Sequence, residues 1–265
     1  MFKTIFSKSL FTLRWQFFGW LLAIFGIVFF TMILYPSFSQ DGIEGLVNSV
    51  PPELKSLIGE ISDFKTIPGY IGQQIFGPNL YIISIIMSIM IFLGISASEE
   101  ADGRLQTLLS YPVSRTQIYF HKLLAASLVV ALISCSVFIG IQISLLLINE
   151  TADVGRIWES IVGFTLINLV YGIIVFATAM LTGNKGKTIL VASGYTVLSV
   201  FITSLAPAVE GLKHVEQFSL LHYYNNPQIM TNGLNGEHIL ILGGVGIVLI
   251  IIGWLGFIRR DVRTN

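Results

Sequence analysis

The sequence predicts an all-α integral membrane protein: a bundle of six transmembrane helices, preceded by an N-terminal interfacial amphipathic helix. The first observation is composition, because 54% of the 265 residues are hydrophobic and only 11% are charged, with a mean hydropathy of +0.78. Soluble domains average about 25% charged residues, so this chain has too few to cover a surface in water. The second observation is six long apolar runs, and the third is the uneven distribution of Lys and Arg between the segments that join them.

The N-terminal segment, residues 2–16, carries apolar side chains at helical spacing and basic ones between them. The apolar set is Phe2, Ile5, Phe6, Leu10 and Leu13, and the basic set is Lys3, Lys8 and Arg14. This pattern favours an amphipathic helix lying among the lipid headgroups before the first span. The alternative is a helical extension of that span.

Six apolar runs of 19 to 26 residues follow, each long enough to cross ~30 Å of hydrocarbon. None has Asp, Glu, Lys or Arg in its central part, so residues 1–265 read as a single transmembrane domain. The expected spans are residues 17–35, 79–97, 123–148, 158–181, 188–206 and 239–258.

The basic residues indicate the orientation of these spans. If both termini are cytoplasmic, eleven of the fifteen Lys and Arg residues fall inside, leaving Lys55, Lys65, Arg156 and Lys213 outside. Cytoplasmic loops carry such an excess. We therefore expect a multi-pass protein of the cell membrane, surrounded by lipid, with both termini in the cytoplasm. The formal net charge of zero gives no indication of nucleic-acid binding.

Motifs for catalysis are missing from the sequence. Residues 183–188 are similar to a phosphate-binding loop, but that loop needs a glycine at the position of Leu181. The four histidines lack metal-ligand spacing, and no catalytic constellation lies at membrane depth. We expect no enzyme activity, no catalytic residue, no metal site and no cofactor bound by this chain.

The spans contain neutral polar side chains but no buried charge of the kind that ion-coupled transporters use. Two interpretations stay open for them. They form hydrogen bonds between helices, or they line a substrate pathway. The residues concerned are Gln142, Asn168, Tyr171 and Tyr195.

The polar segment between the second and third spans, residues 98–122, combines charged residues with leucines at helical spacing. Charges must stay outside hydrocarbon, where each costs roughly 2.5–3.5 kcal/mol. Leu105, Leu108 and Leu109 have the spacing of one helical face, which predicts a short helix over residues 102–111 that ends near Pro112.

Residues 99–123 resemble the cytoplasmic segment of ABC-2 type transporter permeases. The matching positions are Glu99, Glu100, Gly103, Leu105, Leu108, Leu109, Ser110, Pro112, Val113, Ser114, Arg115, Ile118, Lys122 and Leu123. The chain departs from the family pattern at Arg104, Gln106 and His121. The first two departures change the charge of the expected contact face.

The resemblance implies a permease that pairs with a second copy, in a homodimer, and binds a cytosolic ATPase dimer, which holds the ATP and Mg²⁺. It places a coupling helix at residues 103–112. The implied ATPase-coupling residues are Glu99, Glu100, Gly103, Arg104, Leu105, Leu108, Leu109, Pro112, Ser114 and Arg115. A different possibility is that the leucines pack on this chain's own bundle.

The function implied by the resemblance is ATP-driven export of a substrate across the membrane. A second hypothesis is a mechanotransmission subunit that moves no solute and works with an extracytoplasmic partner. A continuous polar or aromatic cavity between two copies would favour export, and a closed apolar interface would favour signalling.

Overall fold

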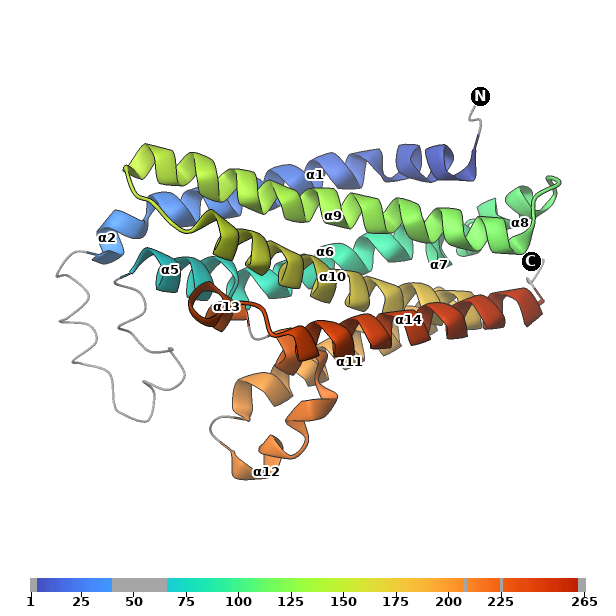
Figure 1. Cartoon of the computed structure of the whole chain (residues 1–265). Coiled ribbons are helices and arrows are strands. Elements are labelled where there is room, and N and C mark those ends of the chain that lie inside the picture. Colours follow the sequence, from blue (N-terminus) through green and yellow to red (C-terminus); the bar gives the residue numbers. More distant parts are fainter. Residues whose placement is uncertain (1–3, 40–65, 207–208, 225, 262–265) are drawn as a thin grey trace.

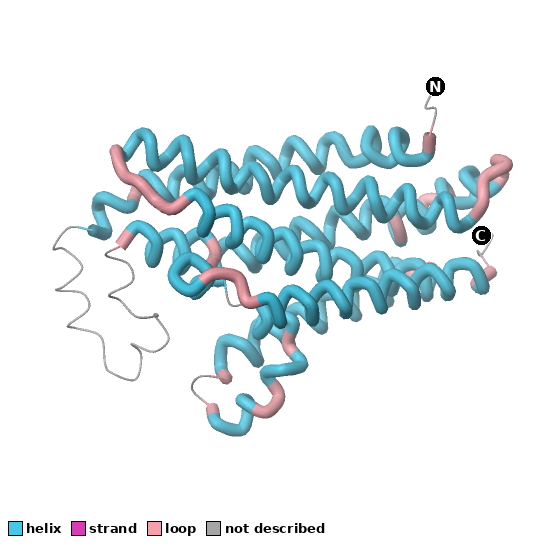
Figure 2. The backbone as a smooth tube through the Cα atoms, viewed as in Figure 1, coloured by secondary structure: helices cyan, strands magenta, loops and turns pink. Residues whose placement is uncertain are grey.

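Six long helices form the body of the protein. The computed structural model describes residues 4–39, 66–206, 209–224 and 226–261, and this part contains helices and loops but no strand (Figure 2). The long helices lie side by side (Figure 1) and are α1 (Ile5–Ile33), α6 (Pro78–Ile95), α9 (Arg115–Ile148), α10 (Val154–Thr182), α11 (Lys185–Leu205) and α14 (Gly236–Arg259). All six are long and apolar enough to cross a membrane, which confirms the six predicted spans.

The short helices gather at the two ends of the bundle. Both chain termini, α7 (Ala97–Ala101) and α8 (Arg104–Leu109) lie at one end, which we call the α8 end (Figure 1). The opposite end, the α13 end, holds short helices and turns: α2 (Tyr35–Ser39), α5 (Ile67–Tyr70), the π-helical turn η2 (Ile71–Ile75), the 3₁₀ turn η4 (Leu220–Tyr224) and α13 (Asn226–Asn232). Near it, α12 (Glu210–Lys213) and the 3₁₀ turn η3 (Glu216–Phe218) follow α11. The polar segment after the second span therefore shares an end with both termini.

Helix α1 is continuous through the segment expected to lie in the interface. Thr4 caps it, its hydroxyl accepting a hydrogen bond from the backbone N–H of Ser7 at 3.2 Å. Its 29 residues give a length of roughly 44 Å, more than the ~30 Å of hydrocarbon. The helix thus fits the alternative of a helical extension of the first span. Residues 1–3, the start of the expected amphipathic helix, lie outside the described part.

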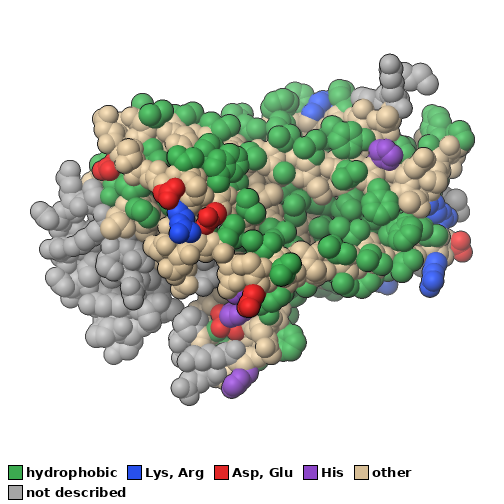
Figure 3. Space-filling view, in the orientation of Figure 1, with side chains coloured by type: hydrophobic (Ala, Val, Ile, Leu, Met, Phe, Trp, Pro, Cys, Tyr) green, Lys and Arg blue, Asp and Glu red, His purple; other side chains and the backbone are tan. Residues whose placement is uncertain are grey.

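Helix α10 is the centre of the bundle and packs against α6, α9, α11 and α14. Close approach to α6 requires Gly172, because a Cβ atom there would lie 2.2 Å from Cδ2 of Phe92 and 2.6 Å from Oγ of Ser88. The outward faces of α1, α11 and α14 are apolar and exposed, and hydrophobic side chains spread over the long helices in Figure 3. Lipid is the medium that such a surface requires.

At the α13 end, Tyr70 joins α5 to the end of α1. Its hydroxyl donates a hydrogen bond to the carbonyl oxygen of Thr31 at 2.7 Å, and its ring packs edge-on against Tyr35. Burial raises the pKa of Tyr70 to about 12, so the phenol remains protonated and keeps this bond at physiological pH.

We predict that Gly172→Ala lowers the free energy of unfolding by about 1–3 kcal/mol, because the added methyl group must displace Phe92 from a close-packed core. Gly194→Ala in α11 is the matched control, since a Cβ atom there meets nothing within 4 Å. Thermal unfolding in detergent, followed by circular dichroism, measures both. Equal melting temperatures for the two variants would contradict the close α6–α10 contact.

Candidate functional site

The polar segment after the second span folds as a break, a turn and a short helix. Helix α6 ends at Ile95, α7 follows, and Gly103 then adopts a left-handed conformation with φ of 74° before α8 starts at Arg104. Glycine is the residue that takes this conformation without strain. The helix expected over residues 102–111 is therefore present, with its regular part at Arg104–Leu109.

The apolar face of α8 points into the chain's own core. Leu105 is 1% exposed and Leu108 is 7% exposed, while Leu109 is half-buried and packs against the same core. This arrangement matches the alternative in which the leucines pack on the bundle. Apart from Pro112, the side chains that α8 and its two flanking turns leave exposed are polar or aromatic: Asp102, Arg104, Thr107, Ser110, Tyr111 and Ser114. Asp102 and Arg104 form an ion pair on this surface.

A groove of about 640 Å³ lies between the start of α1 and the α8–α9 turn. Thr4, Ile5 and Lys8 contribute from α1, facing Tyr111 and the rest of the turn. The other lining residues are Thr107, Leu108, Pro112, Val113, Gln117 and His121. The groove joins the exposed face of the predicted coupling segment to the N-terminal helix.

Ser114 has a local structural role at the start of α9. Its hydroxyl accepts a hydrogen bond from the backbone N–H of Gln117 at 3.2 Å, and the Gln117 side-chain oxygen accepts one from the backbone N–H of Ser114 at 3.3 Å. These reciprocal bonds form a capping box, which satisfies two otherwise free donors at the helix start.

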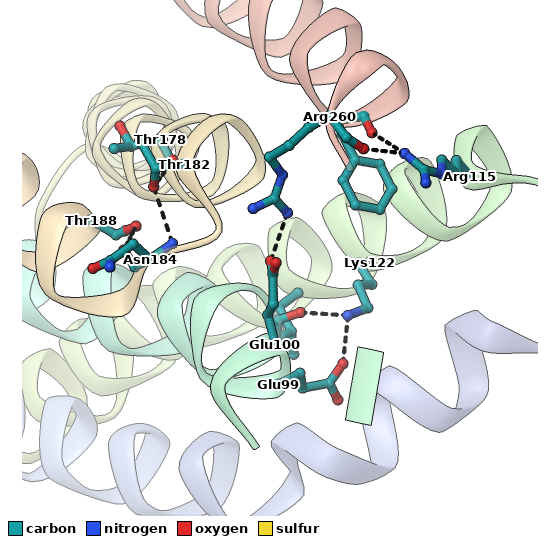
Figure 4. Close-up of polar contacts among 11 residues, drawn as sticks. Glu99, Glu100, Arg115, Lys122, Thr178, Thr182, Asn184, Thr188 and Arg260 are labelled. Carbon is teal, nitrogen blue, oxygen red and sulfur yellow. Dashed lines mark hydrogen bonds and ion pairs between the residues drawn. The ribbon is translucent and has the colours of Figure 1, made fainter. Parts of the chain in front are cut away.

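Behind α8, Lys122 of α9 reaches into the interior. Its ammonium lies 2.5 Å from a carboxylate oxygen of Glu99 and donates to the carbonyl oxygen of Ile95 at 2.9 Å (Figure 4). Lys122 is 0% exposed and Glu99 is 2% exposed. The Ile95 carbonyl belongs to the last turn of α6, where such oxygens lack partners within the helix and a cation is favourable.

A second set of contacts joins α7 and α9 to the end of α14. Arg260 and Glu100 form an ion pair with an N–O distance of 2.7 Å. Arg115 donates to the carbonyl oxygens of Phe257 at 3.1 Å, Ile258 at 3.2 Å and Arg260 at 2.5 Å. Arg115 thereby caps the C-terminus of α14, and Figure 4 shows Arg260 reaching from there to Glu100.

The turn between α10 and α11 makes room for this arginine. Gly183 has φ of 60°, and a Cβ atom on it would lie 1.4 Å from a guanidinium nitrogen of Arg260. The next residue, Asn184, caps α11 by accepting a hydrogen bond from the backbone N–H of Lys187 at 3.0 Å. This segment, the one similar to a phosphate-binding loop, is a helix–helix turn.

We call Glu99, Glu100, Arg115, Lys122 and Arg260 the charged cluster. It connects the ends of α6, α9 and α14, with the α10–α11 turn packed against it. Three of its members were expected to contact an ATPase, but the structure gives Glu99, Glu100 and Arg115 partners within the chain. Sequence reasoning missed Arg260, whose only signal is its position directly after the last span. Each carboxylate of the cluster is paired with a cation, so the cluster forms a rigid ionic joint.

The neutral polar residues of the spans serve mainly as hydrogen-bonding groups. Asn168 is buried in α10, where its side-chain nitrogen donates to the Phe164 carbonyl at 2.7 Å and its backbone carbonyl accepts from the Ser88 hydroxyl at 2.6 Å. Tyr195 of α11 donates to the Phe218 carbonyl at 3.1 Å, and its ring lies 5.8 Å from that of Tyr171.

Gln142 lies apart from the other three, half-buried on α9. In the described part of the chain it shares no hydrogen bond or ring contact with them. Nor do the described residues contain any group of His, Cys, Asp and Glu able to hold a metal ion.

Comparison with known families gives a match over nearly the whole chain. Residues 8–258 match the family model described as the C-terminal domain of the multidrug efflux system permease Rv1217c. No curated protein matches the chain. The matched range includes all of α8 and α9 and most of α1 and α14, and it contains four of the five charged-cluster residues.

We predict that Glu99→Gln destabilises the protein by about 3–5 kcal/mol, because it leaves the Lys122 ammonium buried without its counter-ion. Asp102→Asn is the control, since it breaks an exposed pair, for which a change of about 0–1 kcal/mol is expected. The double variant Glu99→Leu with Lys122→Met removes both charges and should restore most of the stability. Denaturant unfolding in micelles measures all three, and equal effects of Glu99→Gln and Asp102→Asn would refute a buried ion pair.

Proposed function

The chain belongs to the family of the Rv1217c C-terminal domain, a family of multidrug efflux permeases, and from this premise we propose that it is the transmembrane subunit of an ABC-2 type exporter. In this proposal a separate cytosolic ATPase dimer binds and hydrolyses ATP with Mg²⁺, and the permease couples that cycle to export of a substrate. The observation that carries the proposal is α8, a short helix between the second and third spans, at the same end as both termini.

The proposed ATPase contact is the exposed side of α8 and the groove beside it. Leu105 and Leu108 anchor α8 to the bundle from within, so they are unavailable to a partner. Tyr111 is 60% exposed and stands at the edge of the groove, and aromatic side chains of this kind often supply much of the binding energy at interfaces. The excess of Lys and Arg in the segments at the α8 end supports a cytoplasmic location for this surface.

The charged cluster supports a mechanism for the coupling. When nucleotide binding closes the ATPase dimer, the movement displaces α8 together with the core to which its leucines are anchored. Because buried ion pairs tie the α8 region to the ends of α6, α9 and α14, these ends move as one body. Rigid-body rotation of helices in a packed bundle then converts an inward-facing state to an outward-facing one.

A second copy of the chain completes the proposed transporter. The resemblance to ABC-2 permeases suggests a homodimer, and exposed apolar side chains on α11, such as Leu190, Leu198 and Phe201, are available to lipid or to that copy. A substrate path would then run between the copies, because Asn168 and Tyr195 form hydrogen bonds within one copy.

The hydrogen bonds of Asn168 and Tyr195 within one copy also favour the second candidate function, which is mechanotransmission. A subunit in which Asn168 and Tyr195 are already hydrogen-bonded within the chain is suited to transmit force to an extracytoplasmic partner without moving a solute. The two functions are separated by reconstituting the permease with its copurifying ATPase in inside-out vesicles. Export predicts ATP-dependent uptake of amphipathic fluorescent dyes such as ethidium, whereas mechanotransmission predicts ATP hydrolysis with no uptake of any dye or candidate solute.

We predict that Tyr111→Arg reduces copurification of the ATPase about tenfold or more, because it replaces an interface aromatic by a charge without disturbing the core. The control is Phe218→Arg, since Phe218 is comparably exposed, at 70%, and lies away from the α8 end in η3. Pull-down of the tagged permease followed by an ATP hydrolysis assay gives the measurement. An ATPase retained equally by both variants would contradict the proposed docking surface.

A further inference from the structure

A cavity of about 310 Å³ lies at the α13 end, on the side of the bundle away from the charged cluster. It is enclosed by α10, η4, α13, the loop after it and the first two turns of α14. Its lining residues are Gly163, Leu166, Tyr223, Tyr224, Gln228, Ile229, Asn232, Gly233, Leu234, Asn235, His238, Ile239 and Leu242. The volume is at the lower end of the ~300–1,000 Å³ range of small-molecule sites.

The walls of this α13 cavity are fixed by contacts outside it. Tyr224 is 4% exposed, its ring packs against those of Tyr81 and Phe164, and its hydroxyl donates to the carbonyl oxygen of Phe76 at 3.2 Å. On the other side, the backbone N–H of Leu234 donates to the carboxylate of Glu159 on α10 at 3.2 Å. These contacts hold η4 and the α13–α14 loop against the bundle, so the cavity is formed before any ligand arrives.

The lining changes from polar to apolar with depth. The exposed lining side chains are the amides Gln228, Asn232 and Asn235, while Leu242 and Ile229 are buried. Asn235 caps α14, and Leu242 lies two turns further into the same helix, roughly 10 Å along its axis. The cavity therefore extends from hydrogen-bonding groups at the helix end toward the apolar depth of the span.

The described lining contains no Asp, Glu, Lys or Arg, and its ionisable side chains are those of His238, Tyr223 and Tyr224. Arg156 and Glu159, which lie beside the lining residue Gly233, form an ion pair at 2.9 Å, and Glu237 is exposed in the first turn of α14 and lies outside the lining. A phosphate or ammonium group would thus find no counter-ion among the lining side chains. Hydroxyl or amide groups, in contrast, match the amides at the mouth.

We propose that the α13 cavity is a binding site for amphipathic molecules that carry an uncharged, hydrogen-bonding head on an apolar body. The head binds at Asn232 and Asn235, and the body lies along Leu166 and Leu242. The rings of Tyr223 and His238, edge-to-face with centroids 5.6 Å apart, form part of the wall between these two regions. This site is separate from ATPase docking, because binding needs neither nucleotide nor the partner.

The test uses the full-length chain in lipid nanodiscs without nucleotide, labelled with a photoactivatable monoacylglycerol. Two further probes carry the same chain and photoactivatable group on a phosphate head and on an ammonium head. We expect the monoacylglycerol to label peptides within residues 159–166 and 228–242, at least about tenfold more than either charged probe, which corresponds to ~1.4 kcal/mol.

Matched variants locate the site. Leu242→Trp fills the apolar depth and should abolish this labelling, while Leu240→Trp, on the same helix but 76% exposed to lipid, should leave it unchanged. Asn232→Leu alters only an exposed amide at the mouth, so it keeps the fold and should reduce labelling severalfold. Labelling that Asn232→Leu leaves unchanged, or equal labelling by the three probes, would overturn the proposal. Because no ATPase is present, that result would leave the coupling mechanism standing.

Discussion

A buried ammonium group sets the geometry of the α8 end. Lys122 is removed from water, and an ion in that position is tolerated only if its charge and its hydrogen bonds are satisfied. Glu99 supplies the charge and the Ile95 carbonyl a hydrogen bond, and both are in reach because α6 breaks at Ser96 and α7 turns its acids inward. The start of α9 therefore has one well-defined position relative to the break after the second span.

Two arginines extend this constraint to the far end of the chain. Arg115 holds the last carbonyls of α14, and Arg260 returns from that helix to Glu100 past the side-chain-free Gly183. The segment between the second and third spans is thus joined to the end of the sixth. A force applied to α8 would be distributed over several helices, as the proposed coupling to an ATPase requires.

The two ends of the bundle are built from different chemistry. The α8 end is held by buried charges, whereas the α13 end is held by aromatic rings and neutral hydrogen bonds around Tyr70 and Tyr224 together with the half-exposed Arg156–Glu159 pair. Between them, α10 packs closely on its neighbours through glycine contacts such as Gly172. The cavity lined by amides and leucines lies at the α13 end, so the proposed ATPase contact and the proposed site for a small amphipathic molecule lie at opposite ends.

The sequence by itself determined the number of the spans and the presence of a short helix after the second one, because hydropathy and helical spacing are local properties. It also identified Gly103, whose left-handed turn depends on its own missing side chain. Only the tertiary structure decided that Leu105 and Leu108 face inward, that α1 is continuous, and that Glu100 binds Arg260. Burial and ion pairing depend on how helices pack, and a partner far away along the chain leaves no local pattern to read.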